Sequence, residues 1–395
     1  MAASMNFPKT HVAAVLSSLT SPLDFKFVNV TTPTTMPAGS ALVRVLTSQV
    51  ASYSKDVFTG KIPYPMCLPL TPGGGAIGRV ELVGSDAVSL KPGQLVLVDI
   101  CVRARDEPTV SMLQGLFAVG PGVTLMETEW RDGTYAEYVK APLENLFPLD
   151  EHVLVGKLGY NINELAYISK LLVPAGSMHE AGVQPGETVI VAPATGAFGG
   201  AGQIVSSFHR LSNSPVAVSV ALAMGARVVA AGRNRDQLKN LSETIGNLYG
   251  GRLTTVSLAC DVEKDAEALK SATPGGKGAD VYIDFSPPQA STSTHIASSL
   301  FALKPYGRAV FSGGITGQVS IPYQFMMLGN RKVIGSFMAS RPAVHKLVGL
   351  VEAGSLVIGE KGGVKTVTFA LEGLEEAFTV AAERTGLGQQ VVVMP

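Results

Sequence analysis

A glycine-rich turn in the middle of the chain has the residues that bind a phosphate group. Thr188–Ala192 is a short apolar run typical of a strand buried on both faces of a parallel sheet, and small residues and glycines follow it. Glycines let backbone N–H groups approach an anion, and the start of a helix adds partial positive charge. With Arg227–Ala231 as a second strand, the segment predicts a strand–helix–strand unit that binds a dinucleotide. The residues expected to contact its pyrophosphate are Thr195, Gly196, Ala197, Phe198, Gly199 and Gly200.

The residues after the second strand favour a phosphorylated coenzyme. An NAD enzyme places Asp or Glu here to bind both ribose hydroxyls, whereas this chain has Gly232-Arg233-Asn234-Arg235 and no acid before Asp236. A guanidinium can pair with a 2′-phosphate through two hydrogen bonds, so we predict NADPH. The alternative is that the arginines only begin a solvated helix. The expected coenzyme contacts are Arg233, Asn234 and Arg235, with Ser286, Gly313 and Gly314 after later strands of the same crevice.

The spacing within this unit is longer than the dinucleotide pattern requires. The residue that reads the ribose normally follows the glycines by about 20 positions, whereas Gly200 and Arg233 are 33 positions apart. Residues 202–215 have no helical apolar period, and without these 14 residues the spacing would be 19. We interpret them as an atypical insertion, which is either a genuine loop or a translated intron of 14 codons. The transcript sequence decides between the two.

Composition excludes several classes of partner. Lys+Arg and Asp+Glu both number 31, so the net charge is zero and no nucleic-acid or anionic-membrane partner is expected. The longest apolar stretch, 216–226, is too short to span a bilayer, and no secretory signal is visible. Cys67, Cys101 and Cys260 are few and far apart, which argues against a disulfide framework. We therefore expect a cytoplasmic protein.

The elements that must position these residues divide the 395-residue chain into two domains. Short strands separated by Pro and Gly turns fill 10–155, which indicates a barrel-like domain. Strands alternate with helices over 156–325, which indicates a doubly wound parallel sheet, and a terminal strand at 389–393 can return to the first domain. We predict an α/β fold with a barrel-like catalytic domain at 1–155 and 326–395 and a Rossmann dinucleotide-binding domain at 156–325.

Five motifs, in this order, resemble the medium-chain dehydrogenase/reductase superfamily of zinc alcohol dehydrogenases, quinone reductases and enoyl reductases. The likeness covers almost the whole chain and implies a GroES-like β-barrel catalytic domain, a Rossmann domain and an active-site cleft between them. The motifs are Leu68-Pro-Leu-Thr-Pro-Gly-Gly-Gly-Ala-Ile-Gly-Arg-Val80, Lys91-Pro-Gly-Gln-Leu-Val96, Gly133-Thr-Tyr-Ala-Glu-Tyr138, Ala181-Gly-Val-Gln-Pro-Gly-Glu-Thr-Val189 and the turn at Gly196.

Departures from the family pattern remove its metal ligands. Zinc alcohol dehydrogenases have a ligand Cys followed by His where this chain has Ala51-Ser52, and their Gly-His-Glu is replaced by Gly73-Gly74-Gly75. A catalytic zinc needs about three protein ligands of Cys, His or acid type. The four clustered cysteines of the structural-zinc lobe are also missing. The resemblance therefore points to the zinc-independent branch, with no metal.

Without a metal, the charge that develops on a carbonyl must be met by hydrogen-bond donors or by protonation. The resemblance implies that Tyr53, Lys55 and Tyr64 line the cleft as catalytic candidates, a tyrosine donating to the oxygen or to an enolate carbon. The alternative is that they are packing or surface residues. The histidines are scattered, with no acid at the spacing of a catalytic triad, and we expect surface or capping roles for most of His179, His209, His295 and His345.

We predict an NADPH-dependent oxidoreductase that transfers hydride to an activated C=C or C=O of a small organic substrate; the sequence does not distinguish these bonds. Dimers are common in the family, so a homodimer is expected. The alternative is a catalytically silent relative that keeps the fold for binding, which Pro215 favours because a proline inside a helix costs about 3 kcal/mol. Several apolar residues either line a pocket for a lipid-like or polyketide-like substrate of secondary metabolism or belong to the hydrophobic core. They are Met112, Leu113, Phe117, Trp130, Phe325, Met326 and Met327.

Overall fold

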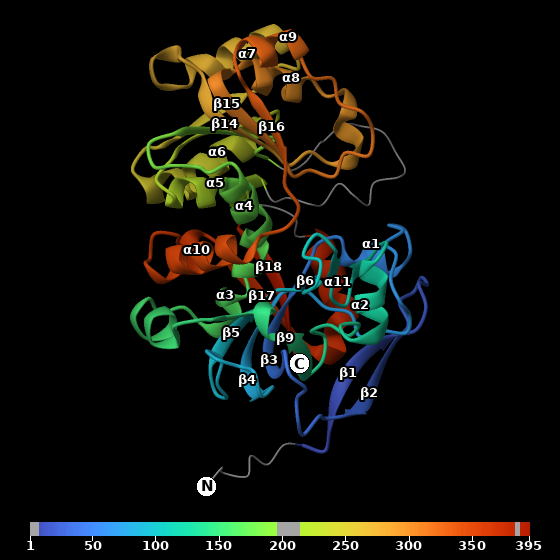
Figure 1. The fold of residues 1–395 in the computed structure, drawn as a ribbon. Coiled ribbons are helices and arrows are strands. Elements are labelled where there is room, and N and C mark those ends of the chain that lie inside the picture. Colours follow the sequence, from blue (N-terminus) through green and yellow to red (C-terminus); the bar gives the residue numbers. More distant parts are fainter. Residues whose placement is uncertain (1–7, 196–213, 384–387) are drawn as a thin grey trace. The chain divides into compact units, whose positions relative to one another are not determined.

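A computed structural model describes residues 8–195, 214–383 and 388–395 of the chain (Figure 1). The chain divides into two compact units: the first extends to Ser169 and resumes at Lys365, and the second comprises Lys170–Val364. The second unit is therefore inserted into the first. Its boundaries differ from the predicted 155/156 and 325/326, because residues 332–335 form a strand of the second unit's sheet and residues 162–165 pack on strands of the first.

One long strand, β3 (Ser40–Val50), organises the first unit. It pairs antiparallel with three others: β4 (Ala76–Val83), β9 (Tyr138–Pro142) and β18 (Gln389–Met394). The sheet continues through β5 (Leu95–Val98) and β10 (Leu146–Pro148) on one side and ends at β17 (Lys365–Ala370) on the other. Its valine-rich face buries Val43, Val45, Val80 and Val96. The predicted return of the terminal strand to the first domain is confirmed.

Smaller elements complete the first unit. β1 (Thr10–Leu16) and β2 (Phe25–Thr31) form a hairpin, and β6 (Cys101–Arg103), β7 (Ser111–Leu113) and β8 (Phe117–Ala118) form a three-stranded sheet beside α2 (Gly122–Thr128). Met112 and Trp130 lie in the core of this small sheet rather than in a substrate pocket, because apolar side chains fill the space between β7 and α2. The helical segments are α1 (Ser54–Phe58), a π-helix (His152–Lys157), α3 (Ile162–Leu165) and α11 (Leu374–Glu383).

The second unit contains the predicted doubly wound parallel sheet. Its strand order places the first two crossovers on one side of β11 (Thr188–Ala192) and the later ones on the other side, at β14 (Ala279–Asp284). Bulky apolar residues align across the strands, as Ile190 pairs with Val229 on one side and with Tyr282 on the other. The full order is β13 (Leu253–Ser257), β12 (Arg227–Gly232), β11, β14, β15 (Leu303–Phe311) and β16 (Lys332–Gly335).

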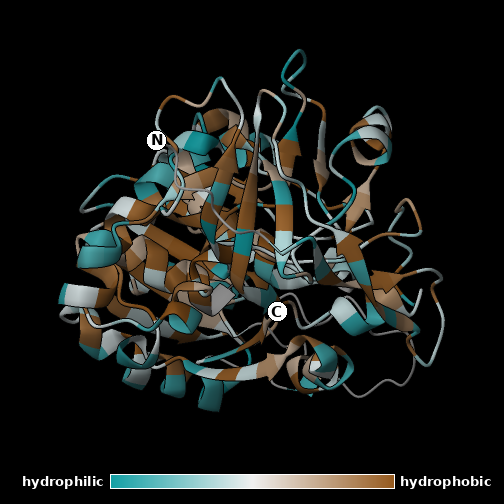
Figure 2. Ribbon diagram, turned by 90° about the horizontal axis from the view of Figure 1, so that it is seen from below, coloured by the Kyte–Doolittle hydropathy of each residue, from teal (hydrophilic) through white to brown (hydrophobic). Residues whose placement is uncertain are grey.

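Helices cover both faces of this sheet. Figure 1 shows α7 and α8 on one face and α5 and α6 on the other. For the chain as a whole, Figure 2 shows many hydrophobic residues on strands and hydrophilic stretches on helices and loops. The interior contains Ile190, Tyr282, Ile296 and Leu300. The helices are α4 (Ile168–Glu180), α5 (Ser214–Ala223), α6 (Arg235–Thr244), α7 (Val262–Ser271), α8 (Thr294–Phe301), α9 (Tyr323–Leu328) and α10 (Arg341–Glu352).

The start of α5 bears on the proposed insertion. The helix begins at Ser214, so Pro215 occupies its first turn, where a proline costs little because its missing N–H has no partner within the helix. Most of the segment 202–215 lies outside the described residues.

No helix in the described part of the chain is long and apolar enough to cross a membrane. Cys67, Cys101 and Cys260 carry free thiols.

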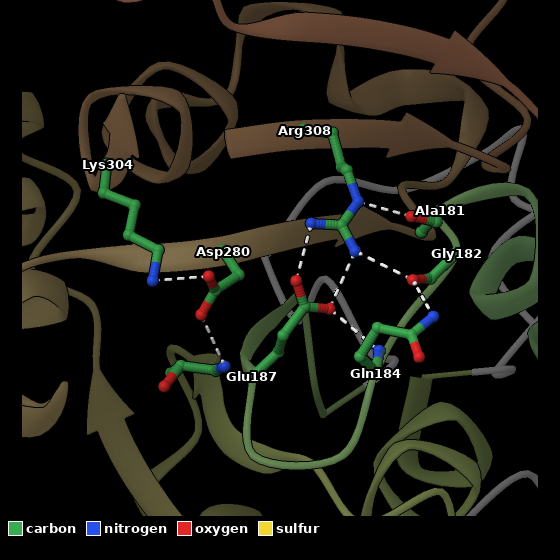
Figure 3. A network of polar contacts seen from close by, with 8 residues as sticks. Ala181, Gly182, Gln184, Glu187, Asp280, Lys304 and Arg308 are labelled. Atoms are coloured by element: carbon green, nitrogen blue, oxygen red, sulfur yellow. Dashed lines mark hydrogen bonds and ion pairs between the residues drawn. The ribbon is translucent and has the colours of Figure 1, made fainter. Parts of the chain in front are cut away.

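Ion pairs close the amino-terminal edge of the parallel sheet (Figure 3). Arg308 on β15 binds both carboxylate oxygens of Glu187, at 3.0 and 2.7 Å, and also donates to the carbonyls of Ala181 and Gly182. Asp280 on β14 pairs with Lys304 and accepts the backbone N–H of Thr188 (2.8 Å). These contacts join β11, β14 and β15 where the strands begin.

Candidate functional site

The opposite, carboxyl-terminal edge of the same sheet is hollowed between β11, β12, β13 and α8. We call this the carboxyl-edge hollow; it contains about 330 Å³ of space not filled by atoms, part of it open to solvent. In open α/β sheets, ligands bind outside the carboxyl ends of the strands, where the strand order reverses. Its lining residues are Pro193, Thr195, Gly232, Arg233, Leu258, Cys260, Ser293, Thr294 and His295.

Two residues predicted to bind coenzyme, Thr195 and Arg233, line this hollow. Thr195 follows β11 and Arg233 follows β12, so the structure brings them together although they are 38 positions apart. Gly232 has no space for a side chain, because a Cβ there would lie 2.7 Å from the Thr195 hydroxyl. The close approach of the two strand ends therefore requires glycine. Gly196, Ala197, Phe198, Gly199 and Gly200 lie outside the described residues.

The neighbours of Arg233 have other partners. The Asn234 side chain accepts the backbone N–H of Gln237 (3.0 Å) and so caps α6, and Arg235 donates to the Ser257 hydroxyl (3.3 Å). Neither residue lines the hollow. Of the three residues predicted for the 2′-phosphate, Arg233 is the one that faces the carboxyl-edge hollow.

The remaining predicted coenzyme residues pack tightly against each other after β14 and β15. A Cβ on Gly313 would lie within 2.6 Å of the Ser286 backbone and 2.8 Å from the Asp284 carboxylate. Gly314 donates its N–H to the Ser286 carbonyl (2.8 Å). The Ser286 side chain is 1% exposed, and its hydroxyl already contacts Asp284 and His295.

A buried histidine and carboxylate were missed in the sequence. His295 is an exception to the surface or capping roles expected for most histidines: it is 3% exposed, and its Nε2 lies 3.5 Å from the Asp284 carboxylate. The fold brings them together because β14 ends at Asp284 and α8 begins at Thr294 beside it. Ser286 lies between them, and Nδ1 of His295 faces Ser293, so the side chains do not form a Ser-His-Asp triad. The sequence contained one indication of this pair: Asp284 ends a predicted strand, and His295 lies in the first turn of the helix that follows.

In the first unit, two of the three predicted catalytic residues lie together. The rings of Tyr53 and Tyr64 are 6.3 Å apart, and Tyr64 also contacts the ring of Phe117 at 5.2 Å. Burial raises the pKa of Tyr53, with smaller contributions from Tyr64 and Tyr135, and burial also raises the pKa of Tyr64. Both phenols therefore keep their protons at neutral pH and can donate hydrogen bonds.

The third predicted catalytic residue has a partner elsewhere. Lys55 lies on α1 and donates from Nζ to the Thr379 hydroxyl of α11 (3.0 Å). This contact joins α1 to α11 within the first unit.

Gly73, Gly74 and Gly75, which are expected to stand in place of metal ligands, are closely packed. Added Cβ atoms would lie 2.1 Å from the Thr134 nitrogen at Gly73, 2.3 Å from the Gln49 carbonyl at Gly74 and 2.5 Å from the Ser169 hydroxyl at Gly75. The Thr134 hydroxyl donates to the Gly74 carbonyl (2.7 Å) and accepts its N–H (3.1 Å).

Side chains that ligate zinc therefore do not fit along 73–75. Across residues 8–195, 214–383 and 388–395, no group of three His, Cys, Asp or Glu side chains is placed to hold a metal ion.

Comparisons with known proteins agree with this architecture. Residues 37–151 match the alcohol dehydrogenase GroES-like domain, and residues 215–353 match the zinc-binding dehydrogenase domain, whose match begins where the atypical segment ends. The chain is 24% identical to D-xylulose reductase A of Aspergillus oryzae over 311 residues, 78% of this chain and 76% of that protein.

Solved structures share the fold. An E. coli CFT073 protein described as a short chain alcohol dehydrogenase, complexed with NADH, has a TM-score of 0.71 at 16% identity and covers 98% of this chain and 100% of its own. A Sinorhizobium meliloti 1021 protein described as a zinc-binding dehydrogenase, bound to NADP, has a TM-score of 0.70 at 20% identity with the same coverage. With both domain matches in the expected order, the chain belongs to the medium-chain dehydrogenase/reductase superfamily, a family of pyridine-nucleotide-dependent oxidoreductases.

Proposed function

We propose that this chain is a zinc-independent, NADPH-dependent oxidoreductase that reduces an activated C=C or C=O of a small organic substrate. The observation that carries the coenzyme choice is Arg233 on the wall of the carboxyl-edge hollow, at the end of β12, where an NAD enzyme needs a carboxylate. Structures of this fold contain either coenzyme, so the preference depends on this residue.

The residues of the hollow fit a dinucleotide. Arg233 would bind the 2′-phosphate, and Thr195, which lines the same hollow at the end of β11, would contact the pyrophosphate. When bound, the coenzyme supplies the hydride. Gly313 and Gly314 complete the same edge of the sheet after β15, and the close packing of Gly313 on Ser286 keeps this edge rigid.

In place of a metal, Tyr53 and Tyr64 are the proposed hydrogen-bond donors to the substrate. Their raised pKa values keep the phenols protonated, so either can stabilise charge on a carbonyl oxygen or deliver a proton after hydride transfer. Lys55 holds α1 through Thr379 and supports the position of Tyr53, the residue before the helix. We expect Tyr53→Phe to lower kcat and Lys55→Met to act mainly on stability.

Two measurements test this proposal. NADPH and NADH are titrated into the full chain while nicotinamide fluorescence is followed, and oxidation of NADPH is then assayed with enones, quinones and aldehydes. Tighter binding of NADPH and its oxidation support the proposal. Absence of NADPH binding by both the full chain and a variant lacking residues 202–215 contradicts it and leaves the catalytically silent relative.

Metal removal tests the zinc-independent step. Because 73–75 cannot accept ligand side chains without backbone shifts, we expect activity to survive dialysis against a chelator and the purified protein to contain no stoichiometric zinc by mass spectrometry. Loss of activity that zinc restores would contradict this part of the proposal alone.

We also propose a cytoplasmic homodimer that assembles through β16. This strand is at the end of its sheet, and apolar residues on it or close to it in the sequence are exposed: Val333, Phe337, Leu328 and Met327, by 40, 62, 69 and 54%. An exposed apolar edge strand can pair with a second copy. Light scattering after gel filtration should give a dimer for the full chain and a monomer for Val333→Lys; a monomeric full chain contradicts the assignment.

A further inference from the structure

A line of hydrogen bonds connects the buried carboxylate at the end of β14 with the wall of the carboxyl-edge hollow. The Ser286 hydroxyl lies 2.5 Å from Asp284 and 2.8 Å from Nε2 of His295. Nδ1 of His295 lies 2.6 Å from the Ser293 hydroxyl. Asp284, Ser286 and His295 are buried, whereas Ser293 is half-buried and lines the hollow together with His295.

The donors and acceptors along this line fix the tautomer of His295. Asp284 receives hydrogen bonds from the Tyr282 hydroxyl (2.9 Å), the Ser286 hydroxyl and the Ser286 N–H (3.1 Å), as expected for an ionised carboxylate. Because Ser286 gives its one hydroxyl proton to Asp284, it can only accept at Nε2. Nε2 of His295 therefore carries a proton, and Nδ1 is the atom that can gain one.

The direction of the Ser293 hydroxyl proton depends on the charge of His295. Ser293 is the residue at the N-cap of α8, yet its side chain makes no capping hydrogen bond. When His295 is neutral, the Ser293 hydroxyl donates to Nδ1. When Nδ1 is protonated, the ring donates to Ser293, and the hydroxyl proton must turn to another acceptor in the hollow.

We propose that His295 is a specificity residue that couples binding of a phosphate-bearing coenzyme to uptake of one proton, an inference that rests on the proposed function. As the phosphate enters the carboxyl-edge hollow, Nδ1 takes a proton from solvent and Ser293 turns its hydroxyl proton to a phosphate oxygen. The new positive charge lies between the phosphate and the Asp284 carboxylate. Arg233 lines the same hollow and is always positively charged, whereas His295 becomes positively charged only when the phosphate binds.

Other titratable and charged groups lie near His295 or on the same hollow in the described part of the chain. Tyr282 and Asp284 face it from β14, and Arg233 and Cys260 reach the same hollow from the ends of β12 and β13. Arginine stays charged at all pH values of interest. Histidine is the side chain that ordinarily changes charge between about pH 5 and 8.

Calorimetric titration of the full chain with NADPH and NADH, in buffers of different ionisation enthalpy, measures the protons taken up. We expect uptake with NADPH above that with NADH, and a preference for NADPH that grows as pH falls, by at most about tenfold per pH unit for one linked proton. The coenzyme's own phosphate also changes protonation, at about pH 6, and contributes equally in every variant. The difference between the full chain and His295→Gln therefore isolates the histidine, and His345→Gln on α10 is the matched control.

The outcomes separate the two proposals. NADPH binding with equal proton uptake in His295→Gln and the full chain overturns the role of His295 and leaves the proposed function intact, whereas absence of NADPH binding by the full chain defeats the proposed function itself. If thermal melting shows that His295→Gln does not fold, Ser293→Ala replaces it. This variant should bind NADPH about fivefold more weakly near pH 6, the loss of one hydrogen bond, and almost normally near pH 8. A pH-independent loss would contradict the coupling.

Discussion

The two edges of the six-stranded parallel sheet are built from different chemistry. At the amino-terminal edge, Arg308 and Lys304 neutralise Glu187 and Asp280, and two backbone carbonyls of the neighbouring turn accept further hydrogen bonds from the guanidinium (Figure 3). At the carboxyl-terminal edge, glycines and hydroxyls surround a hollow.

This difference follows from the direction of the strands. Because all six strands are parallel, the helices begin at the carboxyl-terminal edge and their N-termini attract anions, while the amino-terminal edge has no such field. Charged side chains at the amino-terminal edge can therefore form ion pairs that connect the strands. Groups at the other edge keep hydrogen-bonding capacity for a ligand. The variants below should affect stability at one edge and coenzyme binding at the other.

Arg308→Ala should have the largest effect on stability. It removes two charge-assisted bonds to Glu187 and two to carbonyls, at a site that is about one-fifth exposed, so we expect the free energy of unfolding to fall by about 3 kcal/mol. NADPH affinity should stay within about twofold because the change is at the edge away from the hollow. Urea unfolding and fluorescence titration measure the two. A large loss of affinity in a folded variant would show that the edges are coupled.

Gly313→Ala should disturb the carboxyl-terminal edge. The added methyl group would overlap the Ser286 backbone, and overpacking of this kind costs about 2 kcal/mol. Thermal unfolding gives the change. The matched control is Gly335→Ala at the end of β16, where nothing lies within 4 Å of an added Cβ. Equal effects of the two substitutions would contradict the close-packing explanation.

Arg233→Ala should act mainly on coenzyme binding. Loss of a charge-assisted contact of about 2 kcal/mol raises the Kd of NADPH about 30-fold, while the Kd of NADH changes little. Arg235→Ala is the control, since Arg235 contacts Ser257 and does not line the hollow. Fluorescence titration with both coenzymes distinguishes these cases, and parallel losses for NADH and NADPH would count against the 2′-phosphate role.

Lys304→Ala should have the smallest effect. The lysine is 40% exposed, and pairs of this kind contribute at most about 1 kcal/mol. Asp280 keeps its hydrogen bond from the Thr188 N–H. Urea unfolding should show a small decrease in the free energy of unfolding relative to the unmodified chain. The decrease should be smaller at high salt, because salt already weakens the ion pair of the unmodified chain. A loss as large as that of Arg308→Ala would mean that Asp280 depends on the lysine.

Local patterns were enough to predict the strands that are buried on both faces. Thr188–Ala192 is apolar at nearly every position, and its predicted bounds equal those of β11. β16 was missed because it is an edge strand whose residues are mostly exposed, so Lys332–Gly335 has no buried pattern to read. The boundary error at 325/326 has the same origin.

Contacts made by the fold could not be predicted in the same way. Asp284 and His295 lie close together because the turn between β14 and α8 returns the chain to the same strand end. The spacing of the two residues in the sequence does not predict this contact. The use of Asn234 as a helix cap was likewise hidden, because Asn at this position serves a coenzyme or a helix equally well.

The position of β18 has a consequence for synthesis of the protein. Residues 389–394 lie between β3 and β17, so the main sheet of the first unit is missing an interior strand while the ribosome makes everything before them. The inserted unit, by contrast, has all six of its strands once residue 335 has emerged. We therefore expect the middle of the chain to become protease-resistant first during translation, with the amino-terminal part waiting for the carboxyl-terminal strand.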